Sequence, residues 1–492
     1  MNKTGTQNKL QSKALDILGS LNAKEFNQFG KYLDTFFVSN RNLKKLYGYL
    51  KRYYPSYESP NLSKLNIHKA VYPESAQYSD SKVRKLLSDM YKEAESYISI
   101  THLRKNKLIN DKILLDEFDS RTLDNLFYAK YDEINSFLDS EGAHSYQFLE
   151  KHIIEWINIS FHLERGMQHK IALNVYKRAE YIIFYLLSDM FTTLQDMNAN
   201  LARYNLSQKV NLAQEFISNL DTEKLFRYIE KNFPENIILR IYYLSFHAFN
   251  NIDQEKYYFD LKKLVFNNLK LLHENSRRAA VTFLINYCVR KAAMNRQGFE
   301  SELSENYNVY IKSKLYRLSG ENYLRIDLFL HILGNYFNMG KIREAAEFLN
   351  ENIQVIQPIH RKNMLSLCNA MIEFEKGEFT RSLVSASQLK SNTKLYKDSL
   401  KILILKNNFE LKNYETALEN IANYRKSMEK SESMHEQVKE KSMNFLLYLN
   451  RLVKLANKEP DKKLALELRN EVSTNKNIGE SKWLIKKIDE IT

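Results

Sequence analysis

Three stretches of the chain decide its fold, and they read LGNYFNMGKIREAAEFL (residues 333–349), AMIEFEKGEFTRSLVSA (370–386) and LKNNFELKNYETALENI (405–421). Each places a phenylalanine five residues before a large apolar or aromatic residue and eight residues before a small one. The pattern recurs at offsets of 37 and 35 residues. A repeat of this length is typical of helical arrays, in which each unit buries its apolar face against its neighbours.

The repeated positions have distinct physical roles. Gly340 and Gly377 follow the phenylalanine by three residues, where a residue in the left-handed conformation ends one helix and lets the chain reverse. The small residue at the start of the next helix lets two helices approach closely. The signature residues of the three copies are Phe337, Gly340, Ala345, Phe374, Gly377, Ser382, Phe409, Tyr414 and Ala417.

This order of aromatic, glycine, large apolar and small residues resembles the tetratricopeptide family. The third copy departs from the family pattern, because Lys412 and Asn413 stand where the turn would hold glycine. No tryptophan opens the copies and no proline closes them consistently, so another helical-hairpin repeat stays open as an alternative. The chain, with the stretch INYCVRK at 285–291, is also similar to uncharacterised repeat proteins of Bacteroidetes-type bacteria. The family resemblance implies a peptide or helix held in the concave groove of a superhelix, and no catalysis.

The rest of the composition agrees with helices. Only 12 glycines and 6 prolines occur in 492 residues, whereas average usage is roughly 7% and 5%. Core material is plentiful, since 44% of the residues are hydrophobic and 59 are phenylalanine or tyrosine (27 and 32). Together with the resemblance, this predicts an all-α fold. We expect an N-terminal bundle of short helices, followed by a right-handed superhelix of antiparallel helical hairpins, a tetratricopeptide-like solenoid.

We predict four segments along the chain. They are a basic N-terminal helical domain compatible with a helix-turn-helix (1–110), degenerate helical repeats (111–320), tetratricopeptide-like repeats (321–430) and C-terminal capping helices (431–492). Three of the six prolines, Pro55, Pro60 and Pro73, fall in the first segment. Within it, Asn22 and Glu25 have the spacing of a helix-capping box.

Positive charge is concentrated near the N-terminus. Of the net charge of +14, residues 41–107 carry +8, with 14 Lys or Arg against 6 Asp or Glu. Such an excess attracts acidic partners, although a solvated lysine-rich surface gives the same count. Tyrosines interleave with the lysines at 44–54 and could stack on bases or pack in the core. The candidate polyanion-binding residues are Lys44, Lys45, Lys51, Arg52, Arg84, Lys85, Arg104 and Lys105.

We predict no catalytic, cofactor-binding or metal-binding residues. The segment 334–342 lacks both the glycine spacing and the Ser or Thr of a phosphate-binding loop. An acidic cluster at 116–124 lacks the central glycine of a calcium loop and marks a helix start beside Arg121. Four histidines are spaced by 8, 10 and 7 residues, so that at most one pair shares a helix face; they are His144, His152, His162 and His169.

The cysteines and the apolar runs indicate the compartment. Cys288 and Cys368 lie 80 residues apart in apolar helical stretches, which predicts buried free thiols and a reducing environment. The first residues lack the apolar core of a signal peptide, and the most apolar run, 181–187, is too short to span a bilayer. We therefore expect a cytoplasmic protein without a membrane span.

The function we expect first is that of a non-enzymatic adaptor or scaffold, which binds a protein or peptide partner in the groove of its repeats. The alternative is a nucleic-acid-binding regulator. It would use residues 41–107 against DNA or RNA, with the repeats as a sensing or dimerising module.

Overall fold

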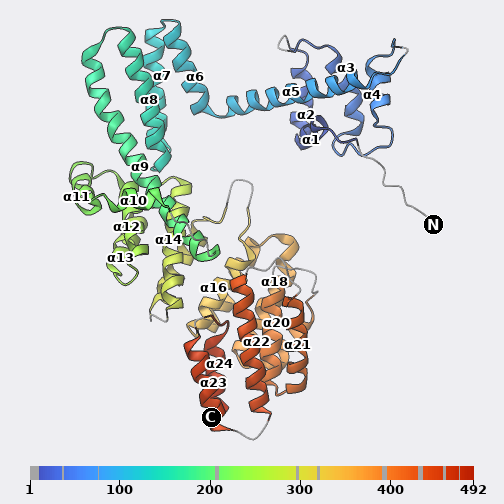
Figure 1. Cartoon of the computed structure of the whole chain (residues 1–492), viewed down its shortest axis with the longest axis vertical. Helices are drawn as coiled ribbons and strands as arrows, with labels where there is room; N and C mark the ends of the chain where they lie inside the picture. Colours follow the sequence, from blue (N-terminus) through green and yellow to red (C-terminus); the bar gives the residue numbers. More distant parts are fainter. Residues whose placement is uncertain are drawn as a thin grey trace. The chain divides into compact units, whose positions relative to one another are not determined.

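The computed structural model describes residues 10–491 except 36–37, 76, 205–209, 295–297, 318–321, 390–395, 430–435, 458–460 and 476. Over these residues the chain forms 24 α-helices and two short 3-10 helices, and no strand (Figure 1). An isolated β-bridge joins Ala143 and Leu272. The predicted all-α fold is confirmed.

The helices gather into two compact units. Unit 1 comprises Met1–Glu141 and Leu149–Ile182, and unit 2 comprises Gly142–Phe148 and Ile183–Thr492. This division is coarser than the four segments expected from the sequence. The boundaries at 110, 320 and 430 stay predictions.

The N-terminal part of unit 1 is a bundle of short helices packed on one long helix. Its core joins leucines to a cluster of aromatic rings, among them Phe26 and Phe29. The predicted capping box is confirmed, because Asn22 accepts from the N–H of Glu25 and the Glu25 carboxylate accepts from the N–H of Asn22. The helices are α1 (Lys13–Ser20), α2 (Ala23–Tyr32), α3 (Asn42–Leu50), η1 (Lys51–Tyr53), α4 (Lys64–Val71) and α5 (Asp80–Lys105).

A second core in unit 1 lies among the next helices. Phe127 and Phe161 stack at its centre with ring centroids 3.8 Å apart. The helices are α6 (Lys107–Ser120), α7 (Asp124–Ser140), α8 (Ser145–Glu164) and α9 (Gln168–Tyr204), and the last two continue into unit 2. Short links between long amphipathic helices favour antiparallel neighbours, and α6 packs against α7.

Unit 2 continues with six helices ahead of the repeats. Successive helices pack on one another from α11 to α15, as expected where links are short. The bounds are α10 (Leu212–Ser218), α11 (Thr222–Asn232), α12 (Ile237–Asn250), α13 (Lys256–Asn268), α14 (Glu274–Ala293) and α15 (Phe299–Lys312).

The three sequence repeats form three helical hairpins in unit 2. Within each hairpin the two helices pack together, and the first helices also contact one another, α16 on α18 and α18 on α20. The hairpins are α16 (Ile326–Asn338) with α17 (Ile342–Asn352), α18 (Pro358–Glu375) with α19 (Phe379–Ser387), and α20 (Lys397–Glu410) with α21 (Tyr414–Glu429). A 3-10 turn, η2 (Ile353–Val355), follows α17.

Three further helices end the chain, and they pack on each other and on the last hairpin. They are α22 (Glu436–Ala456), α23 (Lys462–Thr474) and α24 (Ser481–Ile491). Their apolar residues share one core with α20 and α21.

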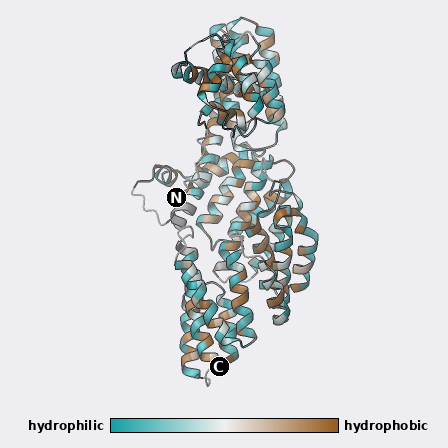
Figure 2. Cartoon of the chain, turned by 90° about the vertical axis from the view of Figure 1, so that its right-hand side faces the viewer, coloured by the Kyte–Doolittle hydropathy of each residue, from teal (hydrophilic) through white to brown (hydrophobic). Residues whose placement is uncertain are grey.

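Apolar and polar residues alternate along the helices, as Figure 2 shows by the interleaving of brown and teal. This is the pattern of helices with one face in a core and the other in water. Among the described residues, none of the helices combines the length and the apolar character that crossing a bilayer requires.

Candidate functional site

The three repeat turns close with the same backbone hydrogen bonds. In each turn, one backbone N–H donates to the carbonyl three residues earlier, and the next N–H donates to the carbonyl five residues before it. This is the pattern of a Schellman turn. The donor and acceptor pairs are Gly340 to Phe337 and Lys341 to Tyr336, Gly377 to Phe374 and Glu378 to Glu373, and Lys412 to Phe409 and Asn413 to Asn408.

The third turn reaches this geometry without a glycine. The φ angles of Gly340, Gly377 and Lys412 are 69°, 82° and 58°, so all three residues are left-handed. Lys412 pays a steric cost for this conformation because it has a Cβ. The third copy, which the sequence leaves weakest, therefore has the same turn as the other two.

The small signature residues lie in the first turn of the second helix of each hairpin. Ala345, Ser382 and Ala417 are each fully buried, as expected for positions of close helix approach. The Ser382 hydroxyl donates to the carbonyl of Ala370 (2.7 Å) and accepts from the side-chain amide of Asn407 (2.9 Å). Ser382 thus ties its own hairpin to the first helix of the next one.

A cavity of about 950 Å³ opens beside the repeat turns of unit 2. The residues that the repeats contribute to its lining include Phe337, Phe374, Gly377 and Phe379, three of which belong to the sequence signature. Its other wall comes from the C-terminal segment, which we define as residues 472–475 and 477–487. We call this space the C-terminal cavity.

The C-terminal segment is fixed against the repeats by specific contacts. The Trp483 indole N–H donates to Glu410 (3.0 Å), and its ring lies 5.5 Å from that of Phe409. Lys406 pairs with Glu480 at 2.8 Å and places its ammonium over the rings of both Phe374 and Trp483. Cation–π contacts of this kind are attractive, so Lys406 links the repeat to the segment.

Charge in the C-terminal cavity is unevenly compensated. Its lining includes six lysines and four glutamates. Lys406, Lys482 and Lys487 form ion pairs with Glu480, Glu300 and Glu410 respectively. Within the described part of the chain, the cavity residues that form no ion pair are Lys376, Lys441, Lys486 and Glu375. The cavity therefore offers a surplus of positive charge to an anionic ligand.

Glu375 lies among charged neighbours of both signs. Partial burial raises the pKa of its carboxyl, and Glu480 and Glu410 act in the same direction. Lys406 and Lys486 oppose them.

Sequence reasoning found the repeat wall of the cavity and missed the opposite one. Trp483 and Glu410, which donate and accept the hydrogen bond between the walls, are 73 residues apart. Nothing in the periodicity links them, because the contact depends on how α24 folds back. The signal that the sequence offered was Trp483 itself, because the chain has only two tryptophans.

The eight candidate polyanion-binding residues are all exposed, but they are spread over unit 1. Arg84 and Lys85 start α5, whereas Arg104 and Lys105 end it. Twenty residues of one α-helix separate them by about 30 Å. Lys44, Lys45, Lys51 and Arg52 lie on α3 and η1.

Acidic neighbours already engage part of this set. Lys44 pairs with Asp34, Arg84 with Asp80, and Lys105 with Glu25 at 3.6 Å. Such exposed pairs are weak, so they lower the local positive potential without blocking the side chains.

The tyrosines interleaved with these lysines pack in the N-terminal bundle. The hydroxyls of Tyr47, Tyr49 and Tyr54 donate to the backbone carbonyls of Phe26, Asn61 and Leu21 respectively. The ring of Tyr54 also stacks on Phe26 with centroids 4.2 Å apart. The sequence allowed these tyrosines either to stack on bases or to pack in the core, and these contacts show packing.

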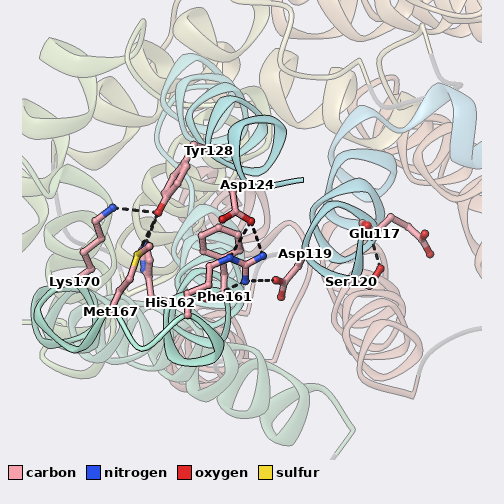
Figure 3. A network of polar contacts seen from close by, with 10 residues as sticks. Glu117, Asp119, Ser120, Asp124, Tyr128, Phe161, His162, Met167 and Lys170 are labelled. Carbon is pink, nitrogen blue, oxygen red and sulfur yellow. Dashed lines mark hydrogen bonds and ion pairs between the residues drawn. The ribbon is translucent and has the colours of Figure 1, made fainter. Parts of the chain in front are cut away.

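Unit 1 also contains a polar cluster between α7, α8 and α9, drawn in Figure 3. Lys170 donates to the Tyr128 hydroxyl (3.1 Å), which lies 3.3 Å from Nε2 of buried His162. Because Lys170 can only donate, the Tyr128 hydroxyl keeps its one proton for an acceptor, and both Nε2 of His162 and Sδ of Met167, at 3.7 Å, lie within reach. Burial lowers the pKa of His162, and the cations Lys170 and Arg165 lower it further.

The acidic cluster predicted to mark a helix start does so only in part, because Asp124 begins α7 whereas Asp116, Glu117 and Asp119 lie in the last turns of α6. Arg165 donates to Asp124 (2.7 Å) and Asp119 (2.7 Å) and lies over the Phe161 ring at 3.6 Å. These contacts tie the link between α6 and α7 to the end of α8. Arg121 pairs with Glu117 instead.

The four candidate histidines have different neighbours. His152 contacts the carbonyl of Arg178, and His144 lies beside His273. His162 belongs to the cluster above, and His169 lies close enough to lower the pKa of His162 further. Over the residues that the structure describes, no group of three or more His, Cys, Asp or Glu side chains is placed to hold a metal ion.

Both cysteines are free and buried, which confirms the prediction for them. Burial raises the pKa of each thiol to about 12, so that both stay protonated at neutral pH. A thiolate is the reactive form, and these two thiols are therefore poor nucleophiles.

Comparison of the sequence with protein-family models gives no match, and comparison with curated proteins gives none either.

Proposed function

We propose that the chain is a non-enzymatic helical-repeat adaptor that binds a protein or peptide partner in the C-terminal cavity. The observation that carries this proposal is the lining of the cavity, where signature aromatics of two repeats lie beside three lysines without an ion pair. Apolar anchors and a polar rim are the components from which peptide-binding sites are built.

The tetratricopeptide resemblance supports the same function. We infer that the three hairpins are tetratricopeptide-like units of a right-handed superhelix, with degenerate copies before them. The equal turns and the contacts among α16, α18 and α20 support this inference. Family members hold peptides or helices in the concave groove of their superhelix, and we propose that the C-terminal cavity is the corresponding binding place here.

Affinity capture from native lysate, with and without nuclease, tests the proposal. The wild-type chain is compared with a variant in which Lys376→Glu and Lys441→Glu reverse two rim charges. Both side chains are exposed, so the substitutions should leave the fold intact. We expect the wild type to retain a partner protein with and without nuclease treatment. The amount of this protein retained by the variant should be at least tenfold lower.

The matched control is Lys454→Glu with Lys463→Glu, an equal charge change on exposed positions of α22 and α23 outside the cavity. Retention by this control at the wild-type level assigns binding to the cavity. Equal retention by all three chains, at matched melting temperatures, would contradict the proposal.

A further inference from the structure

The second and third repeats carry the same aromatic and acidic pair at equivalent positions. Phe374 and Glu375 stand 35 residues before Phe409 and Glu410. Because the two turns share their backbone hydrogen bonds and their left-handed residue, the backbone places the two pairs at equivalent positions ahead of the turn. A group that one pair binds is therefore a guide to what the other pair can bind.

At the third repeat this pair is occupied by a side chain of the protein itself. The Trp483 ring packs nearly edge-on against Phe409, at an interplanar angle of 79°, and its N–H donates to one oxygen of Glu410. Lys487 pairs with the other oxygen at 2.8 Å. The carboxylate of Glu410 thus has an aromatic donor on one side and a cation on the other.

At the second repeat the same pair faces the C-terminal cavity. Phe374 and Glu375 both line it, and Phe379 lies beside Phe374 with ring centroids 5.3 Å apart. Among the described residues nothing donates to the Glu375 side chain. The rim lysines Lys376 and Lys486 lie in the same lining.

We propose that this second-repeat position binds a tryptophan side chain of an acidic partner peptide, as the third repeat binds Trp483. The indole packs on half-buried Phe379 at the edge of the Phe374 ring, whose face the Lys406 ammonium already covers, and it donates its N–H to Glu375. Carboxylates on either side of the tryptophan meet Lys376, Lys441 and Lys486. This inference rests on the proposed function and names the partner chemistry for the same cavity.

Fluorescence anisotropy with three labelled peptides tests the inference on the whole chain. The first peptide has one tryptophan between two pairs of glutamates. In the second, alanine replaces the tryptophan, and in the third, lysines replace the glutamates. We expect the first to bind at least tenfold more tightly than either of the others, because only it supplies both the ring and the charges.

The variant Glu375→Ala separates the two contributions. Removing a negative charge from the cavity strengthens the attraction for any acidic peptide, whereas losing the acceptor weakens the tryptophan peptide alone. We expect the tryptophan peptide to lose about tenfold in affinity and the alanine peptide to lose none. Glu419→Ala, an equal charge change on an exposed position of α21, is the control and should leave both peptides unchanged.

Two results would overturn the inference. If Glu375→Ala binds both acidic peptides as tightly as the wild type does, or more tightly, the cavity recognises charge and not the tryptophan. The capture experiment then decides the adaptor function by itself. If the wild type binds none of the peptides, the proposed ligand is wrong, and the capture experiment still decides whether the cavity binds a protein. Melting temperatures of the variants guard against loss of folding.

Discussion

Single residues at helix contacts account for much of the repeat structure. The spacing predicted close helix approach at Ala345, Ser382 and Ala417, and all three side chains are fully buried. Their role follows from spacing alone, since each begins a helix that packs on the preceding one. The bond from Asn407 to Ser382 could not be predicted, because it crosses from one hairpin to the next.

Two histidines set a pH dependence at the residue scale. Burial lowers the pKa of His162 in unit 1 and of His247 in unit 2 below the ordinary value of 6.5. The unfolded chain then binds these protons at a higher pH than the folded chain does. The two histidines therefore cost no stability above about pH 6.5. Below that pH the free energy of unfolding falls, and it continues to fall until the pH reaches the folded pKa values.

Thermal unfolding at pH 7.5 and 5.5, at equal ionic strength, measures this effect. We expect the wild type to lose stability at pH 5.5. His162→Gln keeps an acceptor for the Tyr128 hydroxyl and should lose less, and His247→Gln should act likewise in unit 2. An unchanged pH response in both variants would assign the acid sensitivity to other groups.

At the scale of elements, the turn of the third repeat is the instructive case. Lys412 adopts φ 58°, a conformation that costs a side-chain-bearing residue roughly 1–2 kcal/mol and glycine almost nothing. Lys412→Gly should therefore stabilise the chain by about 0.5–1 kcal/mol, after the greater freedom of glycine in the unfolded state is counted. Gly377→Ala should destabilise it by about 1 kcal/mol, since its Cβ meets open space and only φ is strained.

Urea unfolding measures both changes. Lys376→Gly provides the control, because Lys376 ends α18 in the right-handed conformation and gains nothing from glycine. Equal effects of the two lysine substitutions would show that the left-handed turn stores no strain.

The elements themselves could be predicted well where the signal was local. Periodicity and turn residues located the three hairpins, and the spacing of Asn22 and Glu25 located the start of α2. The C-terminal cavity could not be predicted in full. Its second wall is held against the repeats by Trp483 and Glu480, whose partners Glu410 and Lys406 lie far away in the sequence.

At the scale of the whole molecule, the distribution of charge limits what the basic segment can do. The eight basic candidates of unit 1 are exposed, yet the two pairs on α5 lie about 30 Å apart. A composition count cannot separate one continuous surface from such a spread. The nucleic-acid alternative therefore remains a prediction with a defined test.

Binding to a random DNA duplex at several salt concentrations provides that test. We expect weak binding that disappears near physiological salt, because few phosphates can be neutralised at once. Reversing Arg104 and Lys105 to glutamate should weaken it about as much as reversing Arg84 and Lys85 does, because neither pair belongs to one continuous surface. Tight binding that persists at this salt and is abolished by reversing Lys44, Lys45, Lys51 and Arg52 would instead favour the regulator.

The two tryptophans of the chain give each unit its own optical reporter. Trp156 lies on α8 in unit 1, half exposed beneath the guanidinium of Arg178, and Trp483 lines the cavity of unit 2. Replacing Trp156 by phenylalanine leaves Trp483 as the intrinsic fluorophore, and its indole N–H donates a hydrogen bond to Glu410. Its emission would then follow occupancy of the cavity in an unlabelled protein, while the converse variant would follow the unfolding of unit 1.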